Sequence, residues 1–389
     1  MCFAMSRSTN QRMKYCLFTT GFPPIVGGQP NYVYSRCVAN PDNLLVVARE
    51  VDGQETFDRA QPFPVKRFSY PETRSGDSLT RVRQVLSATL ALRRAAGASG
   101  PEILEVSTLF PGVLAAVLAF PHRRFPIVSY ALGDDVLKPL KLSGLKQWIL
   151  KVALSRVKLF VAISNYTRSR LVEAGIEPSR IILVHPTINY SLYGRAGNPE
   201  RVRQLLPTHG LMLLTVCKLF PKKNVEGVIR LLPRLLARFP ELLYVVAGDG
   251  IDMPRLRKLT SDLHLEDHVV FMGQVADELM PDLYAAADVF ALLTREDAVS
   301  GTVEGFGIVF LEAGSQGVPV IGPIEGGAGD AVEEGRSGYL VDPENEDEVV
   351  EKLELLLSDP SLRARLGAAG KVRALRPPDW RPLFDWYSR

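Results

Sequence analysis

Cysteine is scarce in this sequence, and its spacing does not fit the usual cysteine-based sites. The 389 residues include four cysteines, and no two of them form a CxxC pair. Zinc sites normally need such closely spaced residues, and the four cysteines also lack the regular spacing that would suggest a disulfide framework. The five histidines, at positions 122, 185, 209, 264 and 268, also lack the spacing of metal ligands. We therefore expect neither a metal nor a disulfide framework, as is typical of a protein in a reducing cytosol.

Long apolar runs are also missing. The N-terminal residues MCFAMSRSTNQRMK lack the apolar core of a signal peptide, and no uninterrupted apolar segment approaches the roughly 20 residues that span a bilayer. Neither a GxGxxG fingerprint nor a Walker A lysine loop is present, which argues against a nicotinamide dinucleotide enzyme or an ATPase. We expect a cytoplasmic protein, whose contact with the inner face of the membrane, if there is one, is peripheral.

Charge is unevenly divided between the two halves of the chain. Residues 1–190 hold 24 Lys and Arg against 13 Asp and Glu, whereas residues 191–389 hold 22 against 30. The stretch 136–172 has eight basic residues and no acidic one, interleaved with apolar residues such as Trp148 and Val152. Such a basic amphipathic surface can dock on anionic lipid or bind an anionic acceptor. A core-packed helix with a solvated basic side would give the same pattern.

Short apolar runs alternate with helical patterns along the whole chain, as expected for buried parallel strands joined by crossover helices. The predicted strands are 14–20, 43–48, 102–106, 127–131, 159–163, 181–184, 212–216, 242–247, 268–272, 289–293, 319–321 and 339–341. Two such series predict an α/β protein with two doubly wound, Rossmann-like domains. We expect these domains at 1–190 and 191–375, with a linker at 189–200 and a tail at 376–389 that packs back on the body.

Two carboxylates bracket a glycine-rich turn in the segment EGFGIVFLE, which runs from Glu304 to Glu312. If a helix begins near Gly307, Glu312 lies one turn inside it and Glu304 lies in the preceding loop. Free backbone N–H groups and the positive end of the helix dipole would then favour phosphate or sugar hydroxyls. A capped helix start without a ligand accounts for the same residues.

Lys218 and Lys223 follow the first predicted strand of the second half, in VCKLFPKKNVE. At the carboxyl end of a strand they would neutralise a diphosphate without a metal, because lysine binds phosphate as a point charge. An ordinary solvated basic loop is the alternative. A third segment, GFPPIVGG, follows the first strand of the chain and ends in Gly27 and Gly28, which permit close approach of the backbone to a ligand.

In their order along the chain, these segments resemble the family-four retaining glycosyltransferases of the GT-B fold. The resemblance covers nearly the whole chain and extends to ISNYTRSRLVEAGI, AGDG, FMGQV, LYAAADVF and GGAGDAVEEGRSGYLVDP. It implies two Rossmann-like domains that face each other across a cleft. It also implies a nucleotide diphosphate sugar as co-substrate, with no other cofactor.

The resemblance further implies roles for particular residues. The donor sugar is expected at Glu304 and at the amides of Gly305, Phe306, Gly307 and Ile308. Glu312 is expected to bind the ribose, and Lys218 and Lys223 the diphosphate. The remaining contacts are expected at Gln274 and Val275 for the base and at Gly27 and Gly28 for the phosphates. The chain departs from the family at 129–135, where Ala131 and Leu132 replace a common histidine and Asp134 is the candidate for polar contacts.

The implied function is transfer of a hexose from a UDP- or GDP-linked donor to an acceptor hydroxyl, with retention of configuration, in glycan, glycolipid or glycoside biosynthesis. We expect an anionic or lipid-linked acceptor and no nucleic-acid partner. Two alternatives stay open at this point, because a fold does not fix a function. They are a non-hydrolysing sugar-nucleotide epimerase and a non-catalytic sugar-nucleotide binding protein.

Overall fold

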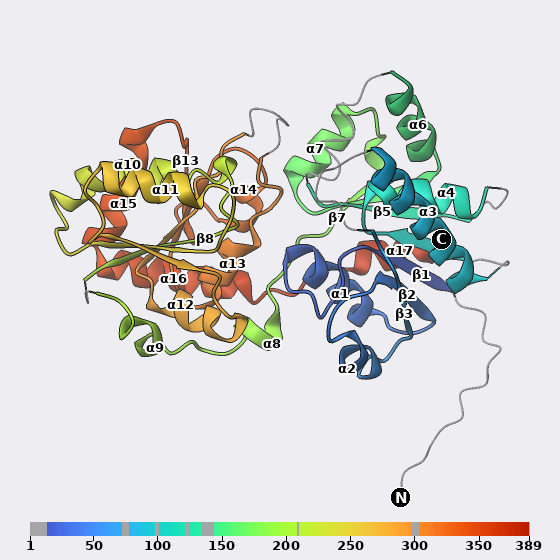
Figure 1. Cartoon of the computed structure of the whole chain (residues 1–389), viewed down its shortest axis with the longest axis horizontal. Helices are drawn as coiled ribbons and strands as arrows, with labels where there is room; N and C mark the ends of the chain where they lie inside the picture. Colours follow the sequence, from blue (N-terminus) through green and yellow to red (C-terminus); the bar gives the residue numbers. More distant parts are fainter. Residues whose placement is uncertain are drawn as a thin grey trace, which may run out of the picture. The chain divides into compact units, whose positions relative to one another are not determined.

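The computed structural model describes residues 14–71, 78–97, 101–121, 125–133, 144–207, 210–296 and 303–388. The chain forms two compact units. The first comprises Met1–Ile163, Thr167–Val184 and Asp379–Arg389, and the second comprises Ser164–Tyr166 and His185–Pro378. Each unit is a parallel sheet covered by helices (Figure 1).

The sheet of the first unit has the order β3-β2-β1-β4-β5-β6-β7, and all its neighbouring strands are parallel. Its strands are β1 Tyr15–Thr19, β2 Leu44–Arg49, β3 Val65–Phe68, β4 Ile103–Val106, β5 Ile127–Ala131, β6 Val157–Ala162 and β7 Ile181–Leu183. Its helices are α1 Gly28–Ala39, α2 Gln54–Arg59, α3 Ser78–Ala96, α4 Leu114–Ala119, α6 Gly144–Ser155, α7 Asn165–Glu173 and α17 Arg381–Tyr387, with short helical turns at Leu109–Val113 and Pro178–Arg180. Buried residues of α3, α4, α6 and α7 share one hydrophobic cluster with the sheet.

One strand of this sheet, β3, was missing from the sequence prediction. It lies at the edge of the sheet and pairs with β2 alone among the described strands. Two of its four residues, Lys66 and Arg67, are charged, so it has no apolar run to mark it. Charged side chains on an edge strand discourage pairing with other chains. A strand of this kind has no continuous apolar run, so a search for buried strands does not find it.

The C-terminal tail packs against the first unit. Trp380, which precedes α17, is buried, and its ring lies 5.1 Å from that of Tyr32. Tyr387, near the end of α17, stacks on Tyr15 at 5.2 Å. The tail therefore covers β1 and α1 with aromatic side chains that would otherwise be exposed to water.

The sheet of the second unit has the order β10-β9-β8-β11-β12-β13, again with parallel neighbours. Its strands are β8 Met212–Val216, β9 Leu243–Ala247, β10 Val269–Gly273, β11 Val289–Ala291, β12 Val320–Pro323 and β13 Gly338–Val341. Its helices are α8 Tyr190–Tyr193, α9 Glu200–Arg203, α10 Val225–Leu236, α11 Met253–Asp262, α12 Met280–Ala286, α13 Ile308–Ser315, α14 Ala328–Ala331, α15 Glu346–Ser358 and α16 Pro360–Ala374, with 3-10 turns at Pro221–Lys223 and Asp277–Leu279. Every strand predicted for this half overlaps an observed one.

The polar stretch 189–200, predicted as a linker, is firmly held by the second unit. Asp282 of α12 is fully buried and accepts hydrogen bonds from Arg195 Nη1 at 3.1 Å, Asn198 N at 2.8 Å and Arg201 Nη1 at 2.6 Å. This cluster fixes the path of the stretch along α12. No helix within the described ranges has the length and apolar character required to cross a bilayer.

Candidate functional site

The chain reverses its direction of travel across the second sheet at β8. From β8 it continues to β9 and β10 on one side, and then returns to β11 on the other side. In open α/β sheets, ligands bind outside the carboxyl ends of the strands at such a switch point. The loops that follow β8 and β11 contain Lys218 and Lys223 on one side and Glu304 on the other.

The loop after β8 is held by backbone contacts. Leu219 N donates to Asp249 O at 3.0 Å, and Asn224 caps α10 by accepting from Gly227 N at 3.1 Å. Gly248 of the AGDG segment has a φ of +125°, and a Cβ there would lie 1.9 Å from Cys217 O. Glycine is required at this position because the loops after β8 and β9 run directly against each other.

Lys223 and Glu304 meet at the switch point. Lys223 Nζ donates to Glu304 Oε2 at 2.5 Å, and both side chains are mostly buried, with 17% and 19% of their surface exposed. Lys218, in the same loop as Lys223, is exposed. The site therefore has a cation and a carboxylate in contact, with a second cation in the same loop.

The glycine-rich turn has the geometry that the sequence predicted, with α13 beginning at Ile308 and Gly307 as its N-cap. Gly307 has a φ of +84°, which favours glycine. Gly327 N donates to Glu304 O at 2.8 Å, and a Cβ on Gly327 would lie 1.9 Å from Gly305 O. No side chain of the described residues caps α13, and the first backbone N–H groups of a helix have no partner inside it, so they are available to a ligand.

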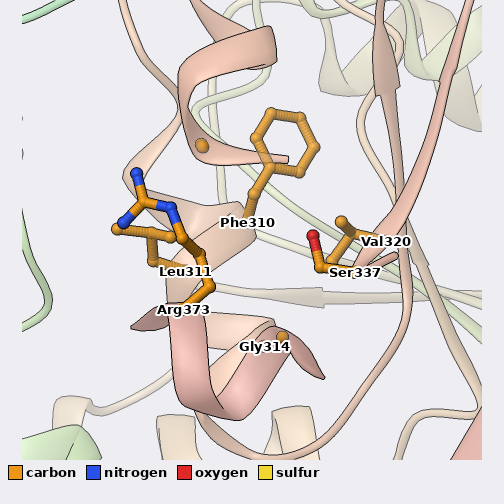
Figure 2. Close-up of a pocket in the computed structure, with 8 residues that line it drawn as sticks. Phe310, Leu311, Gly314, Val320, Ser337 and Arg373 are labelled. Carbon is orange, nitrogen blue, oxygen red and sulfur yellow. The ribbon is translucent and has the colours of Figure 1, made fainter. Parts of the chain in front are cut away.

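α13 packs against α16. Gly314 of α13 faces Gly370 of α16, and a Cβ on Gly314 would lie 3.1 Å from Gly370 O. Figure 2 shows Phe310, Leu311 and Gly314 from α13 around a hollow that Arg373 also lines. This hollow has no room for a water-sized molecule. It is therefore not a binding site, and the open end of α13 for a ligand is its N-terminal end, where Gly307 lies.

Glu312 lies one turn inside α13, with its carboxylate among tyrosines. Tyr284 of α12 donates its hydroxyl to Glu312 Oε2 at 2.9 Å. Burial raises the pKa of Glu312 to about 7, while hydrogen bonds from Tyr284 and from Tyr193 of α8 act in the opposite direction. Sequence reasoning missed both tyrosines, because only the folding of α8 and α12 brings them to α13.

The residues predicted to contact the base follow a different strand from Lys223 and Glu304. Gln274 and Val275 follow β10, which β9 and β8 separate from β11. Gln274 is exposed and Val275 is partly buried. Phe306 is buried, and its ring centroid lies 5.7 Å from that of His185. Phe306 therefore supports the turn through its side chain, so that its backbone amide is the group left for a ligand.

The first unit has its own switch point, between β1 and β4. Gly27, the N-cap of α1, has a φ of +150°, and Gly28 begins the helix. Ser107, which follows β4, donates to Thr19 Oγ1 at 2.8 Å and so joins the two strand ends. Asp134 lies outside the described residues.

The sequence matches models of two families. The model described as Glycosyltransferase Family 4 matches residues 26–192, and that described as Glycosyl transferases group 1 matches residues 198–373. Together the two matches cover most of both units.

Curated relatives match over almost their full length. The GDP-mannose-dependent alpha-(1-6)-phosphatidylinositol monomannoside mannosyltransferase of Mycolicibacterium smegmatis is 29% identical over 378 residues, which are 94% of each chain. A GDP-mannose-dependent monoacylated alpha-(1-6)-phosphatidylinositol monomannoside mannosyltransferase of Corynebacterium glutamicum is 27% identical over 388 residues, with the same coverage.

Solved structures share the fold. HepE of Anabaena, in complex with UDP, has a TM-score of 0.74 and 21% identity, over 97% of this chain and 98% of that one. Sucrose-phosphate synthase of Thermosynechococcus elongatus has a TM-score of 0.76 and 18% identity, over 96% and 98%.

The two Rossmann-like units, the two family matches and the glycosyltransferase relatives identify the protein as a nucleotide-sugar-dependent glycosyltransferase. More narrowly, the chain belongs to the family-four glycosyltransferases of the GT-B fold. The sequence prediction of fold and enzyme class is confirmed, and the transferase is favoured over the epimerase and the binding protein.

Proposed function

We propose that this chain transfers a mannosyl group from GDP-mannose to a hydroxyl of an inositol phospholipid mannoside, with retention of configuration at the anomeric carbon. The observation that carries the donor and acceptor is the end-to-end similarity to two mannosyltransferases of this specificity. The similarity to HepE supports the fold alone and does not favour UDP. Such a reaction takes place at the cytoplasmic face of a membrane, where a soluble donor meets a lipid acceptor.

The contact between Lys223 and Glu304 supports a division of roles at the switch point. Lys223 and the exposed Lys218 would balance the charge of the diphosphate, without a metal ion. Glu304 and the amides of Gly305 to Ile308 would bind the mannosyl hydroxyls at the start of α13. In this account the lysine turns from Glu304 to the phosphate when the donor binds.

Glu312, Gln274 and Val275 would hold the nucleoside. Glu312 accepts hydrogen bonds from the ribose hydroxyls in place of those from the tyrosines. Gln274 and Val275 lie beyond β10 and would contact the base. Gly27 and Gly28 of the first unit would close over the phosphates, and Asp134 is the candidate for a polar contact with the transferred sugar.

The reaction needs no protein nucleophile. The acceptor oxygen forms a bond to the anomeric carbon on the face that the leaving group departs from, while the bond from that carbon to the phosphate oxygen breaks. The bonding electrons leave with GDP, and the proton of the acceptor hydroxyl passes to the departing phosphate. Lys218, Lys223 and the amides at the start of α13 stabilise the charge that develops on the diphosphate.

A transfer assay tests this proposal. Purified protein is incubated with phosphatidylinositol monomannoside and with GDP-mannose, GDP-glucose, UDP-glucose or UDP-N-acetylglucosamine, and the lipid product is identified by mass spectrometry and NMR. We expect a mannosylated product with an α-linkage from GDP-mannose. A product from a UDP-sugar, or a β-linkage, would contradict the proposed donor or the proposed stereochemistry respectively.

A further inference from the structure

The loop that joins β1 to α1 has a buried base and an exposed far end. At its base, Gly21 N donates to Thr19 Oγ1 at 3.1 Å, and the Thr19 hydroxyl donates to Gly21 O at 2.8 Å. Pro23 is buried, whereas Gly28, where α1 begins, is exposed. No side chain of the described residues caps α1, so the first amides of this helix are available to a ligand. We call residues 20–27 the β1–α1 loop.

Arg67 of β3 holds the buried part of this loop. Its Nη2 donates to Pro23 O at 2.6 Å, and its Nη1 donates to Arg49 O, at the end of β2, at 3.0 Å. The guanidinium carbon lies 5.6 Å from the centre of the Phe22 ring, and the side chain of Arg67 is only 7% exposed. One guanidinium group therefore ties the β1–α1 loop to the end of the neighbouring strand.

Asp58 of α2 fixes the orientation of this guanidinium group. Arg67 Nε donates to Asp58 Oδ2 at 2.9 Å, and Arg67 Nη2 donates to Asp58 Oδ1 at 2.7 Å. A bidentate pair of this kind holds the guanidinium plane, because two parallel hydrogen bonds favour a single relative orientation. The other N–H groups then point at the carbonyl oxygens of Pro23 and Arg49.

The burial of Arg67 is unusual for a charged residue on an edge strand. Such a strand can leave its charges in water, as it does for the neighbouring Lys66, which is exposed. Arg67 is instead turned inward, although a buried guanidinium group is costly unless its N–H groups have partners. The cost is offset by the hydrogen bonds to Asp58 and to the backbone, one of which acts directly on the β1–α1 loop.

We propose that Arg67 is a positioning residue for the transfer reaction, which holds the β1–α1 loop so that the amides of Gly27 and Gly28 meet the donor diphosphate without rearrangement. The inference rests on the proposed function, in which these glycines close over the phosphates. Arg67 itself touches no substrate in this account. A loop that is ordered before the donor arrives adds no ordering cost to the reaction, and accurate placement of the reacting groups contributes much of the rate.

This role separates turnover from nucleotide affinity. In the proposed donor site, Lys223 and Glu312 of the second unit bind GDP, so most of the affinity for GDP should survive the loss of Arg67. The β1–α1 loop acts instead on the diphosphate during transfer. Loss of Arg67 should therefore lower kcat by about 10-fold to 100-fold and change the Kd of GDP by less than about threefold.

Four variants test the inference. Arg67→Met keeps the aliphatic stem and removes the hydrogen bonds, and Arg67→Met with Asp58→Asn also removes the carboxylate that would be left without its partner. Arg67→Lys is the conservative variant, because lysine can still donate a hydrogen bond to Pro23 O. The matched control is Lys66→Met on the same strand, since Lys66 Nζ donates to Ala95 O of α3 at 3.0 Å.

Three measurements are made on each variant. Hydrogen exchange with mass spectrometry follows the amides of residues 20–28 and reports the order of the loop without any substrate. Titration calorimetry gives the Kd of GDP, and an assay with GDP-mannose and phosphatidylinositol monomannoside gives kcat. Melting temperatures show which variants keep the fold.

We expect faster exchange of residues 20–28, a lower kcat and nearly unchanged affinity for GDP in Arg67→Met and in the double variant. Arg67→Lys should recover part of kcat and part of the protection from exchange. Lys66→Met should behave as wild type does in all three measurements. If Arg67→Met does not fold, Arg67→Lys carries the same comparison, with smaller changes in the same direction.

Three results would overturn the inference. The first is exchange of residues 20–28 that stays at the wild-type rate when Arg67 is replaced. The second is faster exchange without any loss of kcat, and the third is an equal loss of kcat in the Arg67 and Lys66 variants. A wild-type chain that transfers no mannose from GDP-mannose would contradict the proposed function instead, and hydrogen exchange alone would then decide whether Arg67 holds the loop.

Discussion

At the scale of single residues, Glu312 has surroundings that retain its proton. Burial raises its pKa from 4.5 to about 7, despite the opposing hydrogen bonds from Tyr284 and Tyr193. Between these two pH values the folded protein binds more protons at this site than the unfolded chain does. The contribution of Glu312 to stability is therefore greatest below pH 4.5 and falls as the pH rises to about 7.

Glu312→Gln removes this titration, because glutamine stays neutral. As the pH rises from about 5 to about 8, the free energy of unfolding of the variant should increase relative to that of wild type by on the order of 1 to 3 kcal/mol. Differential scanning calorimetry at the two pH values measures the change as a difference in melting temperature. The control is Glu351→Gln, at an exposed glutamate of α15. Its melting temperature should differ from that of wild type by the same amount at both pH values.

Asp282 is the opposite kind of carboxylate. Burial raises the pKa of Asp282. The hydrogen bond from the backbone N–H of Asn198 and the charges of Arg195 and Arg201 lower this pKa by more than burial raises it, so the net shift is downward. Loss of this carboxylate leaves the arginines and the amide without their common partner.

We expect Asp282→Ala to destabilise the second unit by about 1 to 3 kcal/mol, because hydrogen bonds to a buried charged group are lost while Arg195 and Arg201, which are 44% and 56% exposed, stay in contact with water. The matched control is Asp347→Ala, since Asp347 is 88% exposed and pairs with Arg234. Its loss should cost no more than about 1 kcal/mol. Urea denaturation compares the two, and similar midpoints would show that the Asp282 cluster does not hold residues 195–201.

At the scale of elements, α13 packs closely against α16. Gly367 of α16 faces Gly317, the second residue after the end of α13, and a Cβ on Gly367 would lie 1.8 Å from Gly317 O. The two backbones can approach so closely because Gly367 has no side chain. The donor site is therefore supported by a helix contact on the far side of α13.

Gly367→Ala should destabilise the second unit by about 1 to 3 kcal/mol, through the displacement that the extra methyl group forces. Gly329→Ala is the control, because a Cβ at Gly329 would have its closest neighbour, Leu340 Cδ1, at 3.7 Å. Thermal unfolding measures both variants. Equal melting temperatures would mean that α16 can shift without cost.

The elements differ in how far the sequence predicts them. Strands such as β8 and β9 are predicted because both faces are buried, which demands a continuous apolar run. The start of α13 is predicted because Gly307 marks it. β3 is not predicted, since an edge strand tolerates Lys66 and Arg67. The tyrosines near Glu312 are not predicted either, since α8, α12 and α13 are distant in sequence and meet only in the folded unit.

At the scale of the whole molecule, the uneven charge has a different meaning in each unit. The second half is acidic overall, yet Lys218 and Lys223 lie in one loop at its switch point, so a diphosphate would be attracted by local placement and not by net charge. In the first half, the excess of positive charge includes the arginines of α3, beside exposed apolar side chains. The basic stretch 136–172 predicted from the sequence lies partly outside the described residues, and α3 carries further positive charge in the same half.

The central claim is that the second unit binds the donor through Lys223 and Glu312, and titration calorimetry tests it most directly. GDP, UDP, ADP and TDP are titrated into wild type, Lys223→Ala, Glu312→Gln and the neighbouring control Lys222→Ala. We predict that the wild type binds GDP selectively. Lys223→Ala should lower the affinity for GDP by about 10-fold to 100-fold, as for a charge-assisted hydrogen bond. Glu312→Gln should also lower it clearly, and the control should bind GDP nearly as wild type does. Binding of GDP that survives both site substitutions, or no binding of any nucleotide by the folded protein, would contradict this account.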